Sequence, residues 1–317
     1  MRSVFPNLAR TRYSHLWIEP LKSHSHSNTC NKYYIKRRES RVRILEQGYN
    51  FSKFSLIRGI VVIRSMESSS KKGPFVQNLF VMRHGERMDN YDPEWIASAP
   101  RPWDPPLTDD GKKEARKTGE RLRTQGWNIT RVICSPFLRC IQTAAEVVTA
   151  LCAVQDQPLA IDPSKVKVSI EYGLCEVMNQ FAIRTPPSSP DISWTLDRSE
   201  LEAILPAGTM DHSVEPVWPE LPHWLEKTEK SHERYSKAIQ ALADKFPREN
   251  VLCVTHGEGV GVSVSAFKKD VIVNAVEYCA YSHSQRSIFG SSTDGLNAER
   301  FHVLTESDQS GIRFYNK

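Results

Sequence analysis

The residues with the clearest chemical potential in this sequence are histidines and arginines that directly follow short apolar segments. Three such polar stretches are residues 83–87 (RHGER), 135–139 (SPFLR) and 255–258 (THGE). If the apolar segments are strands of one open parallel sheet, their carboxyl ends meet at one edge, where such sheets bind ligands. His84 and His256 would then lie beside three arginines. Guanidinium groups that converge without matching carboxylates favour an anion, and the planar fork of arginine suits phosphate.

The pattern of apolar residues predicts the elements that would position these side chains. Short buried segments predict strands over 78–82, 129–134, 166–170 and 251–254, and later antiparallel edge strands near 278–281, 287–289 and 301–304. Helices are predicted over 108–126, 136–151 and 219–246. Thr108 is the expected N-cap of the first helix, since Asp109 and Asp110 suit a positive first turn. The alternation of strands and helices predicts an α/β domain with a largely parallel sheet.

The ordered set of motifs resembles the histidine phosphatase superfamily, also called the phosphoglycerate mutase-like superfamily. The matching residues run from about 76 to the last strands: residues 83–87, Leu107-Thr108 with Gly111 and Ala115, Ser135-Pro136 with Arg139, residues 142–144, Glu171 with Gly173 and Glu176, and His256-Gly257. Within the superfamily, the chain is most similar in motif to the phosphatase domains of T-cell-signalling suppressor and ecdysteroid-phosphate phosphatase proteins. It is also similar to plant phosphoglycerate mutase family proteins of unassigned substrate.

The resemblance implies a fold and a domain organisation. The fold is a three-layer α/β/α sandwich with a mostly parallel mixed sheet and a helical or irregular insertion at about 177–222. Residues 74–317 would form the histidine phosphatase domain, and residues 1–73 a basic, disordered N-terminal extension.

The resemblance also implies a metal-independent phosphomonoesterase that acts through a phosphohistidine. In that mechanism His84 attacks phosphorus, and its other ring nitrogen donates to a backbone carbonyl so that the tautomer is fixed. The phosphoryl oxygens would be held by Arg83, Arg87, Arg139 and His256. Glu171 would protonate the leaving oxygen and then activate water, with Glu176 as the competing candidate.

No metal or cofactor is expected, because the sequence shows no evident Cys/His/carboxylate ligand cluster and the arginines would replace a metal's electrostatic role. The seven cysteines include no CxxC pair. Their odd number and apolar surroundings predict core residues in a reducing compartment.

Two other functions compete with phosphate-ester hydrolysis. The first is phosphoglycerate mutase activity, but mutases of the family carry a small hydroxyl residue where this chain has Arg87, and an ERHYG-like segment where it has residues 171–176. The second is a non-catalytic phospho-ligand-binding protein, although every expected catalytic position is filled. The substrate stays open between a phosphorylated small molecule (sugar, nucleotide or lipid-like) and a phosphoprotein, and the oligomeric state stays open, a dimer included.

The charge of the chain is distributed unevenly. Residues 1–65 carry 13 basic and three acidic residues, a balance of +10, whereas residues 66–317 carry 29 and 34, a balance of −5. A nucleic-acid-binding body is therefore not expected, and no apolar stretch is long enough to predict a membrane span. The N-terminal composition fits either a plastid or mitochondrial transit peptide or a dispensable extension upstream of a start at Met66, which would leave the protein cytoplasmic.

Overall fold

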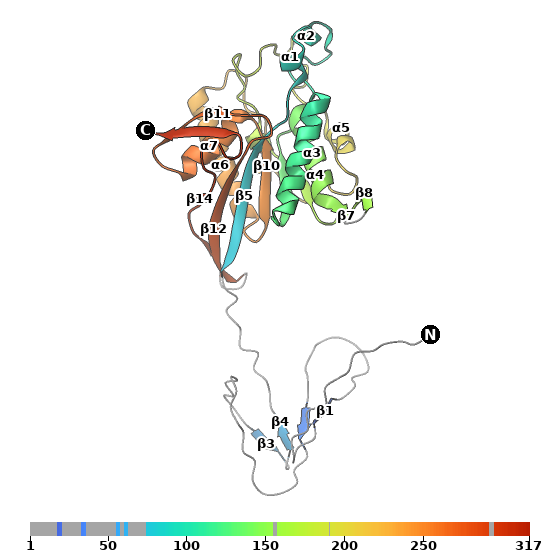
Figure 1. Ribbon diagram of the computed structural model, residues 1–317, viewed down its shortest axis with the longest axis vertical. Helices are drawn as coiled ribbons and strands as arrows, with labels where there is room; N and C mark the ends of the chain where they lie inside the picture. The colour runs from blue at the N-terminus through green and yellow to red at the C-terminus, as the bar shows by residue number, and fades with distance from the viewer. Residues whose placement is uncertain are drawn as a thin grey trace, which may run out of the picture. The chain divides into compact units, whose positions relative to one another are not determined.

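The computed structural model describes residues 74–154, 157–189, 191–291 and 295–317, together with four short strands nearer the N-terminus (Figure 1). It divides into two compact units, Met1–Lys72 and Gly73–Lys317. In the first unit, β1 (Ile18–Pro20) pairs antiparallel with β2 (Tyr33–Ile35), and β3 (Ser55–Ile57) pairs antiparallel with β4 (Ile60–Val62). Residues 1–73 were predicted to be a disordered extension. Apart from these four strands, that prediction concerns residues outside the described ones.

The second unit is built on a seven-stranded mixed sheet. Its strands are β5 (Phe75–Arg83), β6 (Ile129–Cys134), β9 (Lys167–Ile170), β10 (Asn250–Thr255), β12 (Tyr281–Ser291), β13 (Gly295–Ala298) and β14 (His302–Val303). They lie in the order β13-β12-β5-β10-β6-β9, with β14 beside β12. The strands β5, β10, β6 and β9 are parallel, and β12 joins β5 antiparallel. The α/β class and the mixed sheet are confirmed.

Helices flank this sheet. They are α1 (Met88–Tyr91), α2 (Trp95–Ser98), α3 (Asp109–Thr124), α4 (Leu138–Cys152), the 3₁₀ helix η1 (Tyr172–Leu174), α5 (Arg198–Ile204), α6 (Thr228–Lys245) and α7 (Gly257–Phe267). Two further antiparallel pairs join β7 (Ala153–Val154) to β8 (Gln157–Ile161) and β11 (Val271–Val276) to β15 (Ile312–Asn316). Among the described residues, every helix is too short or too polar to span a bilayer.

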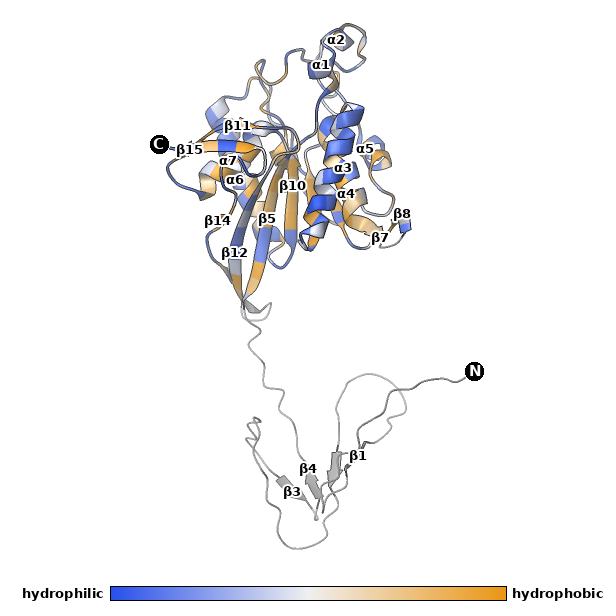
Figure 2. Cartoon of the chain, in the orientation of Figure 1, coloured by the Kyte–Doolittle hydropathy of each residue, from blue (hydrophilic) through white to orange (hydrophobic). Residues whose placement is uncertain are grey.

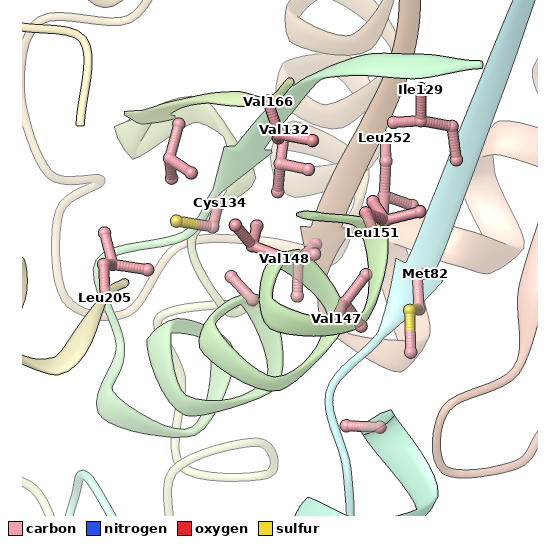
Figure 3. Packing of buried hydrophobic residues seen from close by; sticks show 14 of the residues in the cluster. Met82, Ile129, Val132, Cys134, Val147, Val148, Leu151, Val166, Leu205 and Leu252 are labelled. Carbon is pink, nitrogen blue, oxygen red and sulfur yellow. The ribbon is translucent and has the colours of Figure 1, made fainter. Parts of the chain in front are cut away.

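Alternating side chains of the central strands divide the core into two layers. Successive residues of a strand point to opposite faces, so Phe80 and Met82 of β5 join one apolar cluster while Leu79 and Val81 join the other. The first cluster packs against α3 and α4, where Val147 and other helix residues meet strand residues (Figure 3). The second packs against α6 and α7. The strands are therefore apolar on both faces, while the outer surface of α3 is polar (Figure 2).

The largest differences in bounds between prediction and structure concern one helix and two strands. The helix predicted from residue 219 begins at Thr228 instead. Leu225 has a positive φ of 64°, and Pro222 removes a backbone donor, so the residues before Thr228 cannot continue a helix. The strands predicted near 278–281 and 287–289 are one strand, β12, which begins at Tyr281 because Cys279 has a φ of 55°.

We expect that a chain without residues 1–65 remains folded and active. The acid-poor, basic segment ends before β5 begins at Phe75, and the two large core clusters of the described residues start at Leu79 and Phe80. Thermal unfolding and phosphate release should match those of the full chain. Loss of soluble, active protein on truncation would contradict this expectation.

Candidate active site

Three neighbouring strand ends bring the predicted site residues together. The parallel register places Arg83 of β5 opposite Thr255 of β10, and Val254 of β10 opposite Cys134 of β6. The pairing continues past the strands, because the His84 amide donates to the Thr255 carbonyl at 3.0 Å and the Ser135 amide to the Val254 carbonyl at 3.0 Å. Because β10 lies between β5 and β6, the side chains that follow all three strands face one site.

The segment that carries His84 is held against the first turn of α3. A Cβ on Gly85 would lie 2.7 Å from the Gly111 carbonyl oxygen, and one on Gly111 would lie 2.7 Å from the Glu86 carbonyl oxygen, so both positions need glycine. Thr108 caps α3 by accepting from the Gly111 amide at 2.9 Å, and its hydroxyl donates to the Glu86 carboxylate at 3.0 Å. Glu86 thus has a structural contact.

His84 has the tautomer and charge of a nucleophile. Its side chain is 1% exposed, and its Nδ1 lies 2.7 Å from the Gly85 carbonyl oxygen. Because a carbonyl oxygen only accepts, Nδ1 carries the proton and the lone pair is on Nε2. Burial, together with the positive charge of Arg139, holds the pKa of His84 well below its usual range. A neutral imidazole with a free Nε2 is what attack on phosphorus requires.

Buried guanidinium nitrogens without a partner lie beside this imidazole. Arg139 is 1% exposed; among the described residues its Nε and Nη1 have no hydrogen-bond partner, and neither does Nε of Arg83. Arg83 Nη1 donates to the Val276 carbonyl, and its guanidinium lies 4.2 Å from the centre of the Tyr278 ring. Buried charged donors that lack partners are costly, so these nitrogens indicate a site for an anion.

Two aspartates orient the arginines. Arg87 makes a bidentate ion pair with Asp89, with Nε–Oδ1 at 2.9 Å and Nη2–Oδ2 at 2.6 Å. Asp104, which is 1% exposed, lies 3.5 Å from Nη1 of Arg139 and accepts from the Leu138 amide at 2.8 Å. Burial raises the pKa of Asp104 to about 6, although the charge of Arg139 lowers it. Nε and Nη2 of Arg87 are therefore already bound to Asp89.

His256 connects the site to a buried glutamate. Its Nδ1 lies 3.1 Å from the Glu176 carboxylate, and its Nε2 lies 3.0 Å from the Ser135 hydroxyl. Glu176 also accepts from Arg139 Nη2 at 3.3 Å. Burial alone would raise the pKa of Glu176, but its interactions with His256 and Arg139 hold it well below the usual range. Burial lowers the pKa of His256 to about 4, so its ring is neutral and donates through Nδ1.

Glu171, predicted as the proton donor, is not among these contacts. Its carboxylate accepts three backbone amides: those of Gly173 at 2.9 Å, Val217 at 2.8 Å and Trp218 at 2.9 Å. Burial raises the pKa of Glu171, but both carboxylate oxygens already accept hydrogen bonds from the backbone. The structure therefore places Glu176, and not Glu171, against Arg139 and His256, while Glu171 anchors the backbone of the turn between them.

The sequence showed no sign of a cluster of metal-ligating side chains, but the structure brings one together. His84, Glu176 and His256 offer ligand atoms that all lie within 4.8 Å of one another. Residues far apart in the sequence form this cluster, so spacing along the chain could not reveal it. A cation bound there would have to displace the contact between Arg139 and Glu176. The six cysteines of the described region are all buried and free, as predicted.

Asp89 and Asp104 make contacts at the site but lie outside the matching motif residues. Asp104 lies between prolines just before the Leu107-Thr108 motif, and Asp89 lies two residues after Arg87. These positions are weak sequence signals for a contact with the site. Thr143 bridges the site, since its hydroxyl accepts from the Gly85 amide at 3.0 Å and donates to the Arg139 carbonyl at 2.7 Å. That contact joins the His84 segment to α4.

The chain is similar in sequence to known proteins. Residues 79–164 match the sequence model of the histidine phosphatase superfamily (branch 1). The chain is 28% identical over 254 residues to ecdysteroid-phosphate phosphatase of Drosophila melanogaster, across 68% of this chain and 31% of that protein. It is 28% identical over 232 residues to human ubiquitin-associated and SH3 domain-containing protein B, across 62% of this chain and 32% of that protein. The chain thus spans about a third of the length of these relatives.

A solved structure shows the same fold. The ecdysone phosphate phosphatase of the silk moth Bombyx mori, crystallised with tungstate, superposes with a TM-score of 0.52 at 24% identity, covering 74% of this chain and 96% of the other. The predicted phosphoglycerate mutase-like sandwich is therefore confirmed. His84, His256 and the two arginines with partner-free nitrogens are gathered at three strand ends, and residues 79–164 match the histidine phosphatase superfamily, so the chain is similar to this superfamily in sequence and in fold.

Proposed function

We propose that the protein hydrolyses phosphomonoesters through a phosphohistidine formed on His84. The observation that carries the proposal is the buried, neutral imidazole with a free Nε2, on which the charges of Arg139 and Arg83 act and whose neighbours include buried guanidinium nitrogens that lack partners. These donors would take the phosphoryl oxygens, with Arg87 and His256 completing the set. Charge that spreads over those oxygens in the transition state would then be stabilised without a metal ion.

In the first step Nε2 of His84 attacks phosphorus, and the bond from phosphorus to the leaving oxygen breaks. Glu176 gives its proton to that oxygen, so that an alcohol leaves and a phosphohistidine remains. The carboxylate is ionised in the free site, where His256 and Arg139 hold its pKa low. A bound phosphate competes for both groups and brings negative charge, which raises the pKa of Glu176 and lets it hold the proton.

In the second step Glu176 takes a proton from water. The water attacks phosphorus, the phosphorus–nitrogen bond breaks, and inorganic phosphate leaves with His84 restored to its neutral form. Arg139 contacts Glu176 directly, so the group that binds phosphate and the group that moves the proton are held 3.3 Å apart.

Hydrolysis is preferred over mutase activity. One of the relatives described above is named as a phosphatase, the ecdysteroid-phosphate phosphatase of Drosophila melanogaster. Arg87 also occupies the position where mutases of the family carry a small hydroxyl residue. The substrate class that we propose is a phosphorylated small molecule or a phosphoprotein.

Methanol as a competing acceptor tests the covalent intermediate. If every substrate passes through one phosphohistidine, the ratio of methyl phosphate to inorganic phosphate is the same for aryl and alkyl phosphates at a given methanol concentration. A ratio that changes with the leaving group would show direct transfer to water and would overturn the proposal. Interconversion of phosphoglycerates without phosphate release would favour the mutase instead.

We expect EDTA to leave the rate of phosphate release unchanged. Arginines supply the positive charge in the proposed mechanism, and Glu176 of the cluster with His84 and His256 is already paired with Arg139. The measurement is phosphate release after prolonged incubation with chelator. Activity that disappears and returns on addition of a divalent cation would show that the cluster holds a required metal.

A further inference from the structure

The backbone that carries Glu176 is held by side chains rather than by secondary structure. Residues 173–176 form the end of the short 3₁₀ helix η1 and the two residues after it, and each of their four carbonyl oxygens accepts a hydrogen bond from a side chain. The donors are Arg234 and Tyr235 of α6 and Thr255 at the end of β10, all at most 2% exposed. These three side chains are called the carbonyl clamp below.

Arg234 makes the largest contribution to the carbonyl clamp. Its Nη1 donates to the carbonyls of Gly173 and Cys175, both at 2.9 Å, and its Nη2 donates to the carbonyl of Glu176 at 3.3 Å. The remaining donors form a bidentate pair with Glu226, with Nε–Oε1 at 2.8 Å and Nη2–Oε2 at 2.6 Å. A guanidinium has five N–H groups in a rigid fork, and every one of them is used here.

The other two members of the carbonyl clamp bind the carbonyls in between. The Tyr235 hydroxyl donates to the Cys175 carbonyl at 2.5 Å, and the Thr255 hydroxyl donates to the Leu174 carbonyl at 2.7 Å. Thr255 directly precedes His256, so the same residues that lead into the phosphate site also fix the glutamate segment. On the other side of the turn, Glu171 accepts the Gly173 amide.

We propose that the carbonyl clamp, with Arg234 at its centre, positions Glu176 for proton transfer to and from the phosphoryl group. The inference rests on the proposed function, in which Glu176 is the proton donor. Arg234 touches neither His84 nor the phosphate-binding groups, so it acts only through the backbone that it holds. A lysine at position 234 keeps the charge but lacks the planar fork, so it cannot serve all three carbonyls and Glu226 together.

Leaving-group dependence separates positioning from simple structural support. We compare kcat/KM, which reports steps up to release of the alcohol, for p-nitrophenyl phosphate and propyl phosphate. Arg234→Lys should lower kcat/KM about 10-fold or more for propyl phosphate, whose alcohol needs a proton, and less than about 3-fold for p-nitrophenyl phosphate. Combined with Glu176→Gln, it should cause no further selective loss, because both changes remove the same proton transfer.

Arg286→Lys is the matched control. Arg286 is 3% exposed, pairs with Asp244 at 2.6 Å, and donates to Gln77 at 2.7 Å, near the end of β5 that is remote from His84. Any loss in this variant should be equal for the two substrates. Equal losses in Arg234→Lys, or losses that multiply in the double variant, would overturn the inference.

Two milder variants apply if circular dichroism shows that Arg234→Lys does not fold. Tyr235→Phe and Thr255→Val each remove one donor of the carbonyl clamp, and each should lower kcat/KM selectively for propyl phosphate, by about 3-fold. If each variant changes kcat/KM by the same factor for the two substrates, the inference is overturned. Glu176→Gln without leaving-group dependence would instead refute the proposed proton donor, and this outcome is visible before any variant of the carbonyl clamp is made.

Discussion

We expect the His84→Ala variant to release no measurable phosphate from any substrate. In the described part of the chain, His84 presents a neutral ring nitrogen beside the partner-free nitrogens of Arg83 and Arg139. Removing a covalent nucleophile can lower turnover by about 10⁶-fold. Rapid quenching at alkaline pH with labelled substrate should trap label on the unaltered protein and none on the variant.

The control for this variant is His212→Ala. His212 lies on an exposed loop and pairs with Glu202 at 3.1 Å, so its loss should change neither turnover nor trapped label. Thermal unfolding of both variants shows whether the fold is kept. Label that persists on the His84→Ala variant would place the phosphoenzyme on another residue, and His256, whose ring centre is 5.3 Å from that of His84, would be the first to examine.

Glu176→Gln and Glu171→Gln should separate the two glutamates that the sequence left in competition. Glu176→Gln should lower kcat/KM for propyl phosphate by about 10²-fold to 10⁴-fold, the usual contribution of a general acid, and should change that for p-nitrophenyl phosphate far less. The contacts of Glu176 with Arg139 and His256 are the physical basis of this expectation. Hydrolysis of the phosphoenzyme should also slow, because the same carboxylate activates water.

Glu171→Gln should show a different defect. Its carboxylate accepts three backbone amides, and an amide side chain offers only one oxygen to them. We therefore expect a loss of stability of about 1–3 kcal/mol, measured by urea unfolding, with equal effects on the two substrates. If the leaving-group dependence follows Glu171 and not Glu176, the assignment of the proton donor from the structure is wrong.

The elements that carry the site were predictable because their periodicity is strong. The strand over 129–134 has the predicted bounds, and α3 begins after Thr108 as expected, because a buried strand and a capped helix are local signals. The start of α6 was placed nine residues too early, since the sequence does not show that Leu225 adopts a left-handed conformation.

The sequence by itself determined the α/β class and the resemblance to the histidine phosphatase superfamily. It also predicted the nucleophile and the phosphate-binding arginines that we propose, because these residues follow strands directly and each strand end is a local feature. Only the tertiary structure distinguishes the surroundings of Glu171 from those of Glu176, on which the proposed proton donor rests. Five residues separate them on one irregular turn, where one carboxylate turns to backbone amides and the other to Arg139 and His256. The direction of each side chain depends on groups from α6, from β10 and from residues 217–218. These groups are far from Glu171 and Glu176 in the sequence, so their contacts leave no pattern in the neighbouring residues.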